Sequence, residues 1–542
     1  MAHLQPNSRW LKIGALALLA LAIILRGWLL FIRRFDPDEF QYLRGALCVF
    51  RGWLPYKDFF EHHTPLFFYL LAPLFALGEN PDLIFIARML MFSFAILNLL
   101  LVFRLGRAVY GPAIAWIASV WLSFIVIYFN KTLEIRPLLP ALLFFLSGMI
   151  LAIDPGGRAS NRRAFFAGIF FSLSFLCTQK IIFLLIGVGL AGIVQLRRRE
   201  RGLYHHQIDL RRIALLCTGF LMPLLLFLLY FWVNGGAKDF IYRNIVMNLA
   251  WKRREPLEAY PIGIAYANPF FFFWGIWGWA ATGLGIFTGK ETKTSSFIWF
   301  PASAAVVGLF ATPVVFGQYY ALILPLFAIL AAKGFLDFLS RLQDVPGRKR
   351  LAGCLLILLS GPGLLVLTGF VPVRDPARLA ATPRLLNPLF IGGVAIISLL
   401  LAAEKRQSAI KRSLALLVLL LLSRPTALIF RTHRDNNSEQ MRIIKTIMRR
   451  THPEDRVLDG WEPYGSLLRL PAYYYHFLHE GVLLMMSPEE KGEALLLALQ
   501  ETRPKIIIRG EHLLALSPGV RDYISSHYRG DEGESSFLIR ER

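Results

Sequence analysis

Residues 13–32 read IGALALLALAIILRGWLLFI, an apolar run that contains a single charge, Arg26. A transmembrane helix needs about 20 consecutive apolar residues, so this stretch has the length of one membrane span. The run follows Arg9 and Lys12 and lacks a small-residue cleavage site. We therefore interpret it as a retained first helix rather than a cleaved signal. Arg26, near its far end, is expected to snorkel toward the membrane surface.

The composition indicates that many such runs build the chain. Of its 542 residues, 56% are hydrophobic and only 18% are charged, and the mean hydropathy is +0.51. In soluble domains about a quarter of the residues are charged, so much of this apolar excess must face lipid. This excludes a soluble enzyme, a disordered protein and a disulfide scaffold. The four cysteines show neither metal-ligand nor disulfide spacing.

Further apolar runs recur along the chain as far as residue 430. They lie at about 83–103, 113–129, 138–153, 164–178, 181–196, 213–233, 269–287, 296–316, 319–336, 351–371, 386–403 and 413–430. Together with the first run they predict about thirteen transmembrane helices, although several are shorter than a straight span requires. The predicted fold class is therefore an all-α polytopic membrane protein, with residues 1–430 as its transmembrane module.

The net charge is +23, a balance that often indicates nucleic acid as a partner. Here the cations cluster in alternate short loops, such as Arg197–Arg199 and Arg348–Arg350, which is typical of cytoplasmic loops in membrane proteins. We therefore expect membrane lipids rather than nucleic acid as partners, and a cytoplasmic N-terminus. The predicted external segments are residues 33–82, 130–137, 234–268, 372–385 and everything after residue 430.

The first external loop, residues 33–82, contains an apolar stretch, Pro65–Gly78 (PLFFYLLAPLFALG). It is too short for a span, and counting it as one would place the later arginine clusters outside. We interpret it as an external helix that lies in the membrane interface or re-enters the membrane. Long ordered loops of this kind usually carry function.

Residues 431–542 are predicted to form a small soluble extracytoplasmic α/β domain. Residues 438–450 suit an amphipathic helix, Ser487-Pro488-Glu489-Glu490 is a capping box that opens another helix to about residue 500, and residues 456–459, 505–509 and 536–540 are expected to be strands. Because this tail has no glycine-rich phosphate loop, we expect no catalytic role for it.

The densest polar group is Asp36-Pro37-Asp38-Glu39, directly after the first helix. Carboxylates this close together repel one another and raise each other's pKa unless they are solvated, paired with cations or bound to a metal. Two interpretations are open: a solvated helix cap, since these residue types open helices well, or a catalytic group.

The same loop continues with Pro55–Leu66 (PYKDFFEHHTPL), which places His62 and His63 directly before the interfacial helix. Adjacent histidines on a helix point in different directions, so the pair is a poor metal chelator by itself. The two rings could donate hydrogen bonds to a phosphate. The alternative is that they are ordinary interfacial histidines.

Four residues elsewhere are expected on the same external side. Glu134 and Arg136, in the short second loop, form either a mutual ion pair or a substrate contact. Lys180 is a lone cation in an apolar stretch, which by default indicates function, with snorkelling as the alternative. Tyr319 offers a hydroxyl group there, although tyrosines are common at membrane interfaces.

The acids and cations expected on the external side together favour one type of reaction. The acids can accept a proton from a hydroxyl or amine, the cations can stabilise a departing anion, and the surrounding solvent is lipid. A reaction with a lipid phosphate as leaving group fits all three features. It requires no nucleotide site, and the sequence contains no Walker or Rossmann signature.

The order of DPDE after the first helix, then PYKDFFEHHTPLFFYL, then a second helix bearing Arg88 resembles the GT-C membrane glycosyltransferases. The most similar groups are the protein O-mannosyltransferases and the lipid A aminoarabinose transferases. The resemblance covers the helix order over about residues 10–430 and implies an inverting glycosyltransferase of a bacterial inner membrane. Its donor would be a polyprenyl-phosphate-linked sugar, and its acceptor a glycan, lipid or protein hydroxyl outside the cytoplasm.

The resemblance also implies residue roles. Asp38 matches the family's catalytic base, with Asp36 as an alternative and Glu39 beside them. His63, in His63-Thr64-Pro65-Leu66, matches a basic residue near the lipid phosphate or acceptor. Lys180 is similar to a lysine that contacts the donor phosphate, although Gln179 is inserted before it. Glu134 would have to replace an acid that the aminoarabinose transferases carry before their proline, a departure that argues against lipid A as the substrate.

Two other functions remain open at this point. A transporter or lipid flippase also needs charges in the membrane, but it often shows internal repeats, and we find none in the sequence. A non-catalytic assembly subunit would use the soluble tail as a binding module. Acid pairs can bind Mg²⁺ or Mn²⁺, so the sequence leaves metal dependence open, as it does the identity of the sugar.

Overall fold

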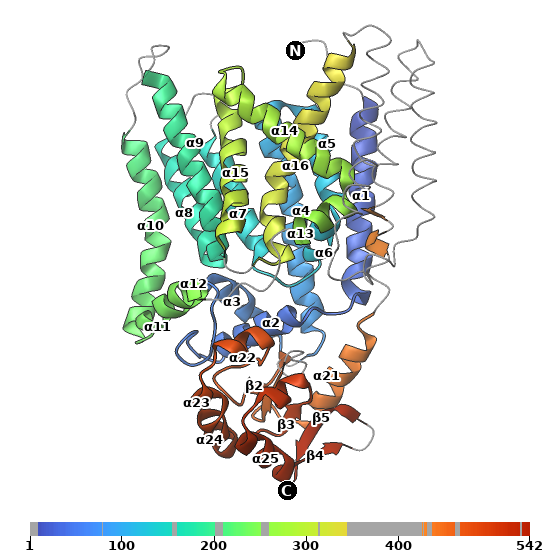
Figure 1. Ribbon diagram of the computed structural model, residues 1–542, viewed down its shortest axis with the longest axis vertical. Coiled ribbons are helices and arrows are strands. Elements are labelled where there is room, and N and C mark those ends of the chain that lie inside the picture. The colour runs from blue at the N-terminus through green and yellow to red at the C-terminus, as the bar shows by residue number, and fades with distance from the viewer. Residues whose placement is uncertain are drawn as a thin grey trace.

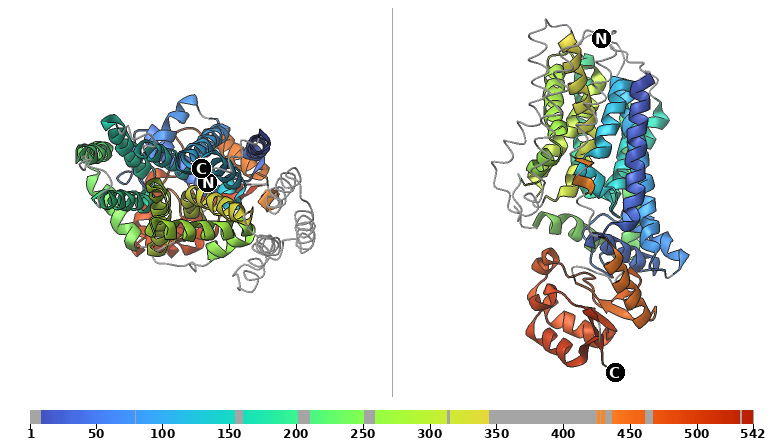
Figure 2. Two further views of the ribbon diagram at one scale, coloured as in Figure 1. Left: turned by 90° about the horizontal axis from the view of Figure 1, so that it is seen from above. Right: turned by 90° about the vertical axis from the view of Figure 1, so that its right-hand side faces the viewer.

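The computed structural model describes residues 9–78, 80–153, 160–200, 210–250, 259–312, 315–343, 425–426, 428–430, 436–460, 467–531 and 534–541. A bundle of helices occupies the upper part, and a smaller part with a β-sheet lies beneath it (Figures 1 and 2). We call this smaller part, the described residues from 436 to 541, the C-terminal unit. Helix α1 (Arg9–Ile32) begins at the far end of the bundle and ends beside this unit.

Among the described residues, six helices are long and apolar enough to cross a membrane: Lys12–Ile32, Leu83–Tyr110, Leu210–Val233, Pro269–Phe287, Lys293–Ala311 and Gly317–Arg341. Shorter apolar helices cover Leu66–Leu77, Pro112–Phe124, Leu138–Ala152 and Gln179–Val194. A multi-pass membrane protein is therefore supported, but the count of about thirteen spans is not. The predicted runs at 351–371 and 386–403, and most of 413–430, lie outside the described residues.

The helices of the bundle have the following bounds: α4 (Leu83–Tyr110), α5 (Pro112–Phe124), α6 (Val126–Lys131), α7 (Leu138–Ala152), α8 (Asn161–Cys177), η2 (Gln179–Ile181), α9 (Ile182–Glu200), α10 (Leu210–Val233), α13 (Ala259–Ala267), α14 (Pro269–Phe287), η4 (Lys293–Ser295), α15 (Ser296–Ala311) and α16 (Gly317–Gln343). Short helices gather at the end of the bundle that faces the C-terminal unit (Figure 1): α2 (Pro37–Phe50), α3 (Leu66–Leu71), η1 (Ala72–Leu77), α11 (Ala237–Ile241), η3 (Tyr242–Val246) and α12 (Met247–Ala250). The stretch predicted to be an interfacial helix, Pro65–Gly78, forms α3 and η1 at this end.

One predicted span is broken. The run at 113–129 forms α5 and α6, which are separated at Ile125, where the backbone is extended. Arg26 is buried beside this break, donates hydrogen bonds to the carbonyl oxygen of Ser123 (2.9 Å) and to Oγ1 of Thr132 (3.1 Å), and lies over the ring of Phe129. The expectation that Arg26 snorkels is therefore wrong. Its guanidinium instead satisfies a carbonyl group that the broken helix leaves unpaired.

The C-terminal unit contains a five-stranded sheet with the order β2-β1-β3-β5-β4. Strand β1 (Arg456–Leu458) runs parallel to β2 (Leu470–Pro471) and β3 (Ile506–Ile508), while β5 (Glu534–Arg540) runs antiparallel to β3 and β4 (Tyr528–Asp531). The helices of the unit are α21 (Ser438–Arg450), α22 (Glu480–Met485), α23 (Pro488–Lys491), α24 (Glu493–Thr502), η6 (Glu511–Ala515) and α25 (Pro518–His527). The expected amphipathic helix and all three expected strands are present.

The predicted capping box is confirmed, but the helix that it opens is short. Ser487 Oγ accepts the N–H of Glu490 at 3.1 Å, and the Glu490 carboxylate accepts the N–H of Ser487 at 2.7 Å. The helix ends at Lys491, because Gly492 adopts a non-helical conformation. A second helix, α24, then continues the predicted helical stretch to Thr502.

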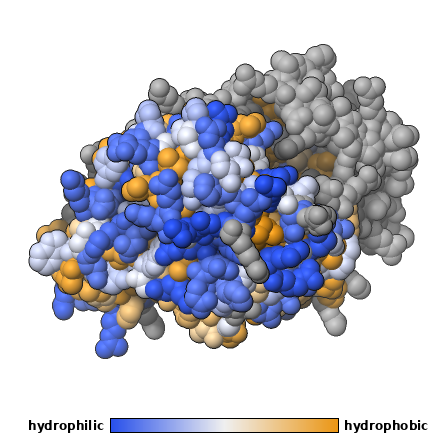
Figure 3. All heavy atoms as spheres, turned by 90° about the horizontal axis from the view of Figure 1, so that it is seen from below, coloured by the Kyte–Doolittle hydropathy of each residue, from blue (hydrophilic) through white to orange (hydrophobic). Residues whose placement is uncertain are grey.

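The outer surfaces of the two parts differ. The end of the molecule formed by the C-terminal unit is largely hydrophilic (Figure 3). Helix α10, in contrast, exposes large apolar side chains such as Leu225, Leu226 and Trp232. An apolar surface of this kind is expected to face lipid, whereas the hydrophilic end is expected to face water.

The C-terminal unit packs firmly on the first external loop. One hydrophobic cluster joins Phe40 and Ile84 to Ile444 and Phe537, and a second joins Phe60 to the aromatic stretch that precedes α22. The loop between α1 and α4 is thus enclosed between the bundle and the C-terminal unit. This enclosed layer contains the acids and histidines that the sequence singled out.

Candidate active site

The acidic stretch opens helix α2. Asp36 is the N-cap, and its Oδ1 accepts the N–H of Asp38 at 3.1 Å. Glu39 Oε1 in turn accepts the N–H of Asp36 at 2.9 Å, which completes a capping box. Asp36 and Glu39 therefore cap the helix as one interpretation expected, but Glu39 is buried rather than solvated, and the carboxylate of Asp38 contacts Arg136.

Both carboxylate oxygens of Glu39 accept hydrogen bonds from other groups of the protein. Its carboxylate forms two hydrogen bonds with Arg88 of α4, at 2.6 and 2.7 Å, and both side chains are completely buried. Arg88 also donates to the carbonyl oxygens of Leu30 (2.8 Å) and Arg33 (3.0 Å). This bidentate pair fixes the end of α1, the start of α2 and the start of α4 relative to one another.

Arg136 lies at the centre of the acids. It donates to Asp36 Oδ1 at 2.8 Å and to Asp38 Oδ2 at 2.5 Å, and its Nε donates to Glu134. Lys131 Nζ lies 2.9 Å from Glu134 and 3.6 Å from Asp36. The short second loop and the first loop therefore share one ion-pair network, in which the mutual pair of Glu134 and Arg136 also includes both aspartates.

These charges shift the pKa values of the acids in different directions. Burial raises the pKa of Asp36 despite the nearby Arg136. Burial by itself would also raise the pKa of Asp38, but the charges of Arg136 and Lys131 outweigh it, and this pKa is lowered. The Asp38 side chain keeps 34% of its surface exposed. Asp38 is therefore an ionised carboxylate that a substrate can reach.

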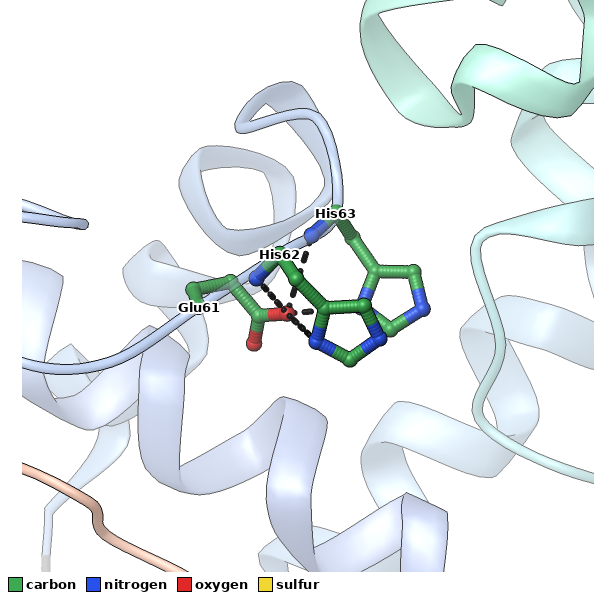
Figure 4. A group of neighbouring side chains, drawn as sticks. All are labelled: Glu61, His62 and His63. Carbon is green, nitrogen blue, oxygen red and sulfur yellow. Dashed lines mark hydrogen bonds and ion pairs between the residues drawn. The ribbon is translucent and has the colours of Figure 1, made fainter. Parts of the chain in front are cut away.

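The backbone of Glu61, His62 and His63 turns around one oxygen of the Glu61 carboxylate (Figure 4). We call these three residues the histidine turn. Glu61 Oε1 accepts the N–H groups of His62 (2.8 Å) and His63 (3.1 Å), and it also lies 2.6 Å from His63 Nδ1. The two imidazole rings have centroids 4.0 Å apart. Burial is the main cause that holds the pKa values of both histidines well below their usual range, so both rings are neutral near pH 7.

The hydrogen bond to Glu61 determines the tautomer of His63. A carboxylate only accepts hydrogen bonds, so Nδ1 must carry the ring hydrogen, and Nε2 of the neutral ring is left with a lone pair. In this form His63 offers an acceptor at Nε2. It suits contact with a hydroxyl group better than contact with a phosphate.

Glu61, His62 and His63 could also hold a divalent cation, because their ligand atoms lie within 4.8 Å of one another. However, Glu61 Oε1 already accepts three N–H groups. As arranged, the group is a hydrogen-bonded turn, and we assign no reaction step to a metal.

Lys180 lies in η2, where its Nζ is 4.1 Å from the ring centroid of Tyr319 in α16. The neighbouring Gln179 bonds to the histidine turn: its Nε2 donates to the carbonyl oxygen of His62 at 2.9 Å. Lys180 also lowers the pKa of His63, as does Arg136. The structure therefore brings the acids, the histidine turn and Lys180 into one region.

The sequence analysis missed several residues of this region. Tyr42 lies one turn after Asp38 on α2 and contacts His63, with ring centroids 5.6 Å apart. The i, i+4 spacing from Asp38 was the available signal. Lys131 belongs to the charge network, and His479 of the C-terminal unit lowers the pKa of Asp38. No local pattern in the sequence connects His479 with the first loop.

The chain is similar to known proteins in structure and not in sequence. No protein-family profile and no curated protein sequence matches the chain. The structure of ArnT from Cupriavidus metallidurans bound to undecaprenyl phosphate is similar, with 14% identity, 97% of each chain covered and a TM-score of 0.60. The apo state of the same protein gives a TM-score of 0.58. Archaeal oligosaccharyltransferase AglB from Archaeoglobus fulgidus, with an inhibitory peptide and a dolichol-phosphate, matches at 11% identity, covering 99% of this chain and 75% of that one, with a TM-score of 0.50.

These likenesses extend over almost the whole chain, including the C-terminal unit. They show that the protein has the GT-C fold, as the motifs of its first external loop predicted. At such low identity they concern the fold, and the function must be argued from the site itself.

Proposed function

We propose that this protein is an inverting glycosyltransferase that moves a sugar from a polyprenyl-phosphate-linked donor to an extracytoplasmic acceptor. The observation that carries the proposal is Asp38: an ionised carboxylate, partly exposed and held by Arg136. It lies in the same region as Lys180 and the neutral His63. The binding of undecaprenyl phosphate by a protein of the same fold supports the choice of donor.

In the proposed reaction, Asp38 accepts the proton of an acceptor hydroxyl. The acceptor oxygen then forms a bond to the anomeric carbon of the sugar, and the bond between that carbon and the phosphate oxygen breaks. The polyprenyl phosphate departs with the electron pair, and Lys180 stabilises its negative charge. A single displacement of this kind inverts the anomeric configuration. In this proposal His63 Nε2 accepts a hydrogen bond from the acceptor.

The other acids and Arg136 have positioning roles in this proposal. Glu39 fixes the start of α2 through Arg88, and Glu134 with Asp36 holds Arg136 against Asp38. Tyr319 packs against the Lys180 side chain, and His62 supports the turn that presents His63.

We further propose residues 1–430 as the transmembrane module and residues 431–542 as an extracytoplasmic domain, in a bacterial inner membrane with the N-terminus in the cytoplasm.

The first prediction tests the base. Asp38→Asn should abolish transfer of labelled sugar from a polyprenyl-phosphate donor to cell-envelope acceptors, because the amide cannot take the proton. Asp82→Asn is the matched control: Asp82 belongs to the same external loop but is exposed and lies outside the charge network. The assay uses full-length protein in lipid nanodiscs. Turnover retained in Asp38→Asn, at the level of the control, would contradict the proposed function.

A further inference from the structure

Tyr56, in the first external loop, has an unusual backbone conformation. Its φ is +71°, in the left-handed region that aromatic residues rarely adopt, and the residue is almost completely buried. A conformation of this kind persists only where the surrounding structure fixes it, and it is found most often at functional sites. Contacts of its ring, its hydroxyl group and its backbone hold Tyr56 in place.

The ring of Tyr56 packs against two helices of the bundle. Its centroid lies 5.4 Å from that of Phe231 in α10 and 5.4 Å from that of Phe240 in α11, and both contacts are edge-to-face. Phe231 and Phe240 stack on each other, with centroids 4.9 Å apart. This packing determines where the phenol hydroxyl of Tyr56 lies.

The hydroxyl of Tyr56 bonds to the backbone of the histidine turn. It donates to the carbonyl oxygen of His63 at 2.6 Å, in a buried environment. The N–H of His63 donates to Glu61 Oε1 at 3.1 Å, and His63 Nδ1 lies 2.6 Å from the same oxygen. Tyr56 and Glu61 thus hold His63 by its backbone on both sides and by its ring. The position of Nε2, the atom that the proposed reaction uses, follows from these three bonds.

The C-terminal unit holds the backbone of Tyr56. The hydroxyl of Tyr474 donates to the carbonyl oxygen of Tyr56 at 2.6 Å, and the carbonyl oxygen of Tyr474 accepts the N–H of Phe60 at 2.8 Å. Within the loop, the N–H of Tyr56 donates to the carbonyl oxygen of Phe59 at 2.9 Å. Tyr474 therefore bonds to the first external loop at two points, on either side of the turn that begins at Tyr56.

We propose that Tyr56 is a positioning residue for His63, and that the C-terminal unit acts on the site through Tyr474 and Tyr56. The hydrogen bonds run from the Tyr474 hydroxyl to the Tyr56 backbone, and from the Tyr56 hydroxyl to the His63 backbone. They keep the Nε2 lone pair of His63 in the place where an acceptor hydroxyl donates to it. The inference rests on the proposed function, and it gives a positioning role to a unit for which the sequence predicted no catalytic one.

Three substitutions that each remove a single hydroxyl group test this role. Tyr56→Phe removes the bond to His63 and keeps the ring. Tyr474→Phe leaves Tyr56 itself intact and removes the bond to its carbonyl oxygen, so it tests the same series of bonds if Tyr56→Phe fails to fold. Tyr475→Phe is the matched control, because the Tyr475 hydroxyl donates to Glu490 within the C-terminal unit, at 2.7 Å, and not to the first loop.

Two quantities are measured on full-length protein in lipid nanodiscs. Native mass spectrometry gives the affinity for undecaprenyl phosphate, which depends on the phosphate site and not on His63. Turnover is measured with radiolabelled undecaprenyl-phosphate hexoses and pentoses as donors and a cell-envelope extract as the source of acceptor. It is expressed per molecule that binds the lipid, so that a smaller folded fraction does not by itself change it.

We expect Tyr56→Phe to lower turnover about tenfold or more and Tyr474→Phe about threefold or more, because a small displacement of a reacting group has effects of this size. Both variants should bind undecaprenyl phosphate within about twofold of wild type, and Tyr475→Phe should keep both quantities. Turnover in Tyr56→Phe no lower than in Tyr475→Phe would overturn the inference. So would an equal loss of lipid affinity and turnover, because it would indicate a general structural role. Wild-type turnover in Tyr474→Phe would overturn the part played by the C-terminal unit.

The same measurements distinguish failure of this inference from failure of the proposed function. A wild-type protein that transfers none of these sugars would overturn the proposed function and this inference with it. An active wild type together with a fully active Tyr56→Phe variant would overturn only the role of Tyr56.

Discussion

Asp36, Asp38 and Glu39 are neighbours in sequence, but their surroundings give them different properties. The side chain of Glu39 is completely buried against Arg88, while those of Asp36 and Asp38 keep 24% and 34% of their surfaces exposed. The pKa of Asp36 is raised and that of Asp38 is lowered. Environment rather than residue type therefore selects Asp38 as the base that is ionised and reachable.

The second prediction concerns Lys180, which we propose binds the phosphate of the lipid-linked donor. Lys180→Met keeps an apolar stem of similar length but removes the ammonium group, so the affinity for undecaprenyl phosphate should fall about 10- to 100-fold. If the acceptor is known, its KM should change less than that of the donor. Binding to nanodisc-embedded protein measures the effect.

The control for this prediction is Lys238→Met, because Lys238 is an exposed lysine of α11 at the same end of the bundle. It should bind undecaprenyl phosphate like the wild type. Equal affinities in Lys180→Met and Lys238→Met would exclude Lys180 from the phosphate site.

At the scale of elements, the interruption between α5 and α6 is the feature that brings the second loop to the site. The chain leaves the helical conformation at Ile125 and turns through α6 toward Glu134 and Arg136. Arg26 stabilises the interruption through Ser123 and Thr132. A cation inside the bundle thus has a structural role in this element.

The third prediction follows from these contacts. Arg26→Met should lower the free energy of unfolding by about 1–3 kcal/mol, because each hydrogen bond between membrane helices contributes about 0.6–1.7 kcal/mol. Unfolding of the purified protein in detergent measures it. Arg104→Met, which removes an exposed arginine of α4, should change stability little. A loss in Arg26→Met no larger than in this control would show that the break needs no capping.

The sequence predicted the helices and strands better than it predicted the tertiary contacts between them. Apolar run length located most described helices of the bundle, an amphipathic pattern located α21 and a capping box located α23, because these features depend on neighbouring residues. The break at Ile125 was missed, since no proline or glycine marks it. The pairing of Arg136 with Asp38, which are 98 positions apart, depends on tertiary packing, which one sequence does not encode locally.

At the scale of the whole molecule, a buried ion pair fixes the C-terminal unit to the first loop. Arg44 of α2 lies 2.7 Å from Asp459, which directly follows β1, and neither side chain is exposed. Arg44 also donates to the carbonyl oxygens of His476 and Val457. Buried pairs of this kind specify a geometry, and removing one partner leaves an uncompensated charge.

The fourth prediction uses this pair. Arg44→Met should destabilise the docked C-terminal unit by about 3–5 kcal/mol, because Asp459 would remain buried without its partner. Hydrogen exchange of residues 451–541 would report the loss. The exposed pair Arg442–Glu439 provides the control, since Arg442→Met should cost less than about 1 kcal/mol. Equal protection in the two variants would contradict a docking role for Arg44.

The fifth prediction concerns pH. Burial, assisted by the charge of Arg44, lowers the pKa of His476 to about 3, and Glu61 and His62 are the other titratable groups that act on it. The unfolded state binds a proton below the ordinary pKa of about 6.5, while the folded state does not. Stability is therefore retained above about pH 6.5 and lost as the pH falls toward 3, by about 2 kcal/mol at pH 5.

Replacing the ring removes this contribution. His476→Phe should unfold with a smaller difference between pH 7.5 and pH 5 than the wild type, as measured by denaturation in detergent. An unchanged difference would show that His476 is not the titrating group.

A segment that is synthesised early and one that is synthesised late meet just before the acidic stretch that opens α2. The N–H of Asn437 donates to the carbonyl oxygen of Ile32, and Gln440 exchanges hydrogen bonds with the backbone of Phe35, 405 positions earlier. These contacts of Ile32 and Phe35 can therefore form only after residues 437–440 have been synthesised. A nascent chain that stops before residue 437 would lack both contacts.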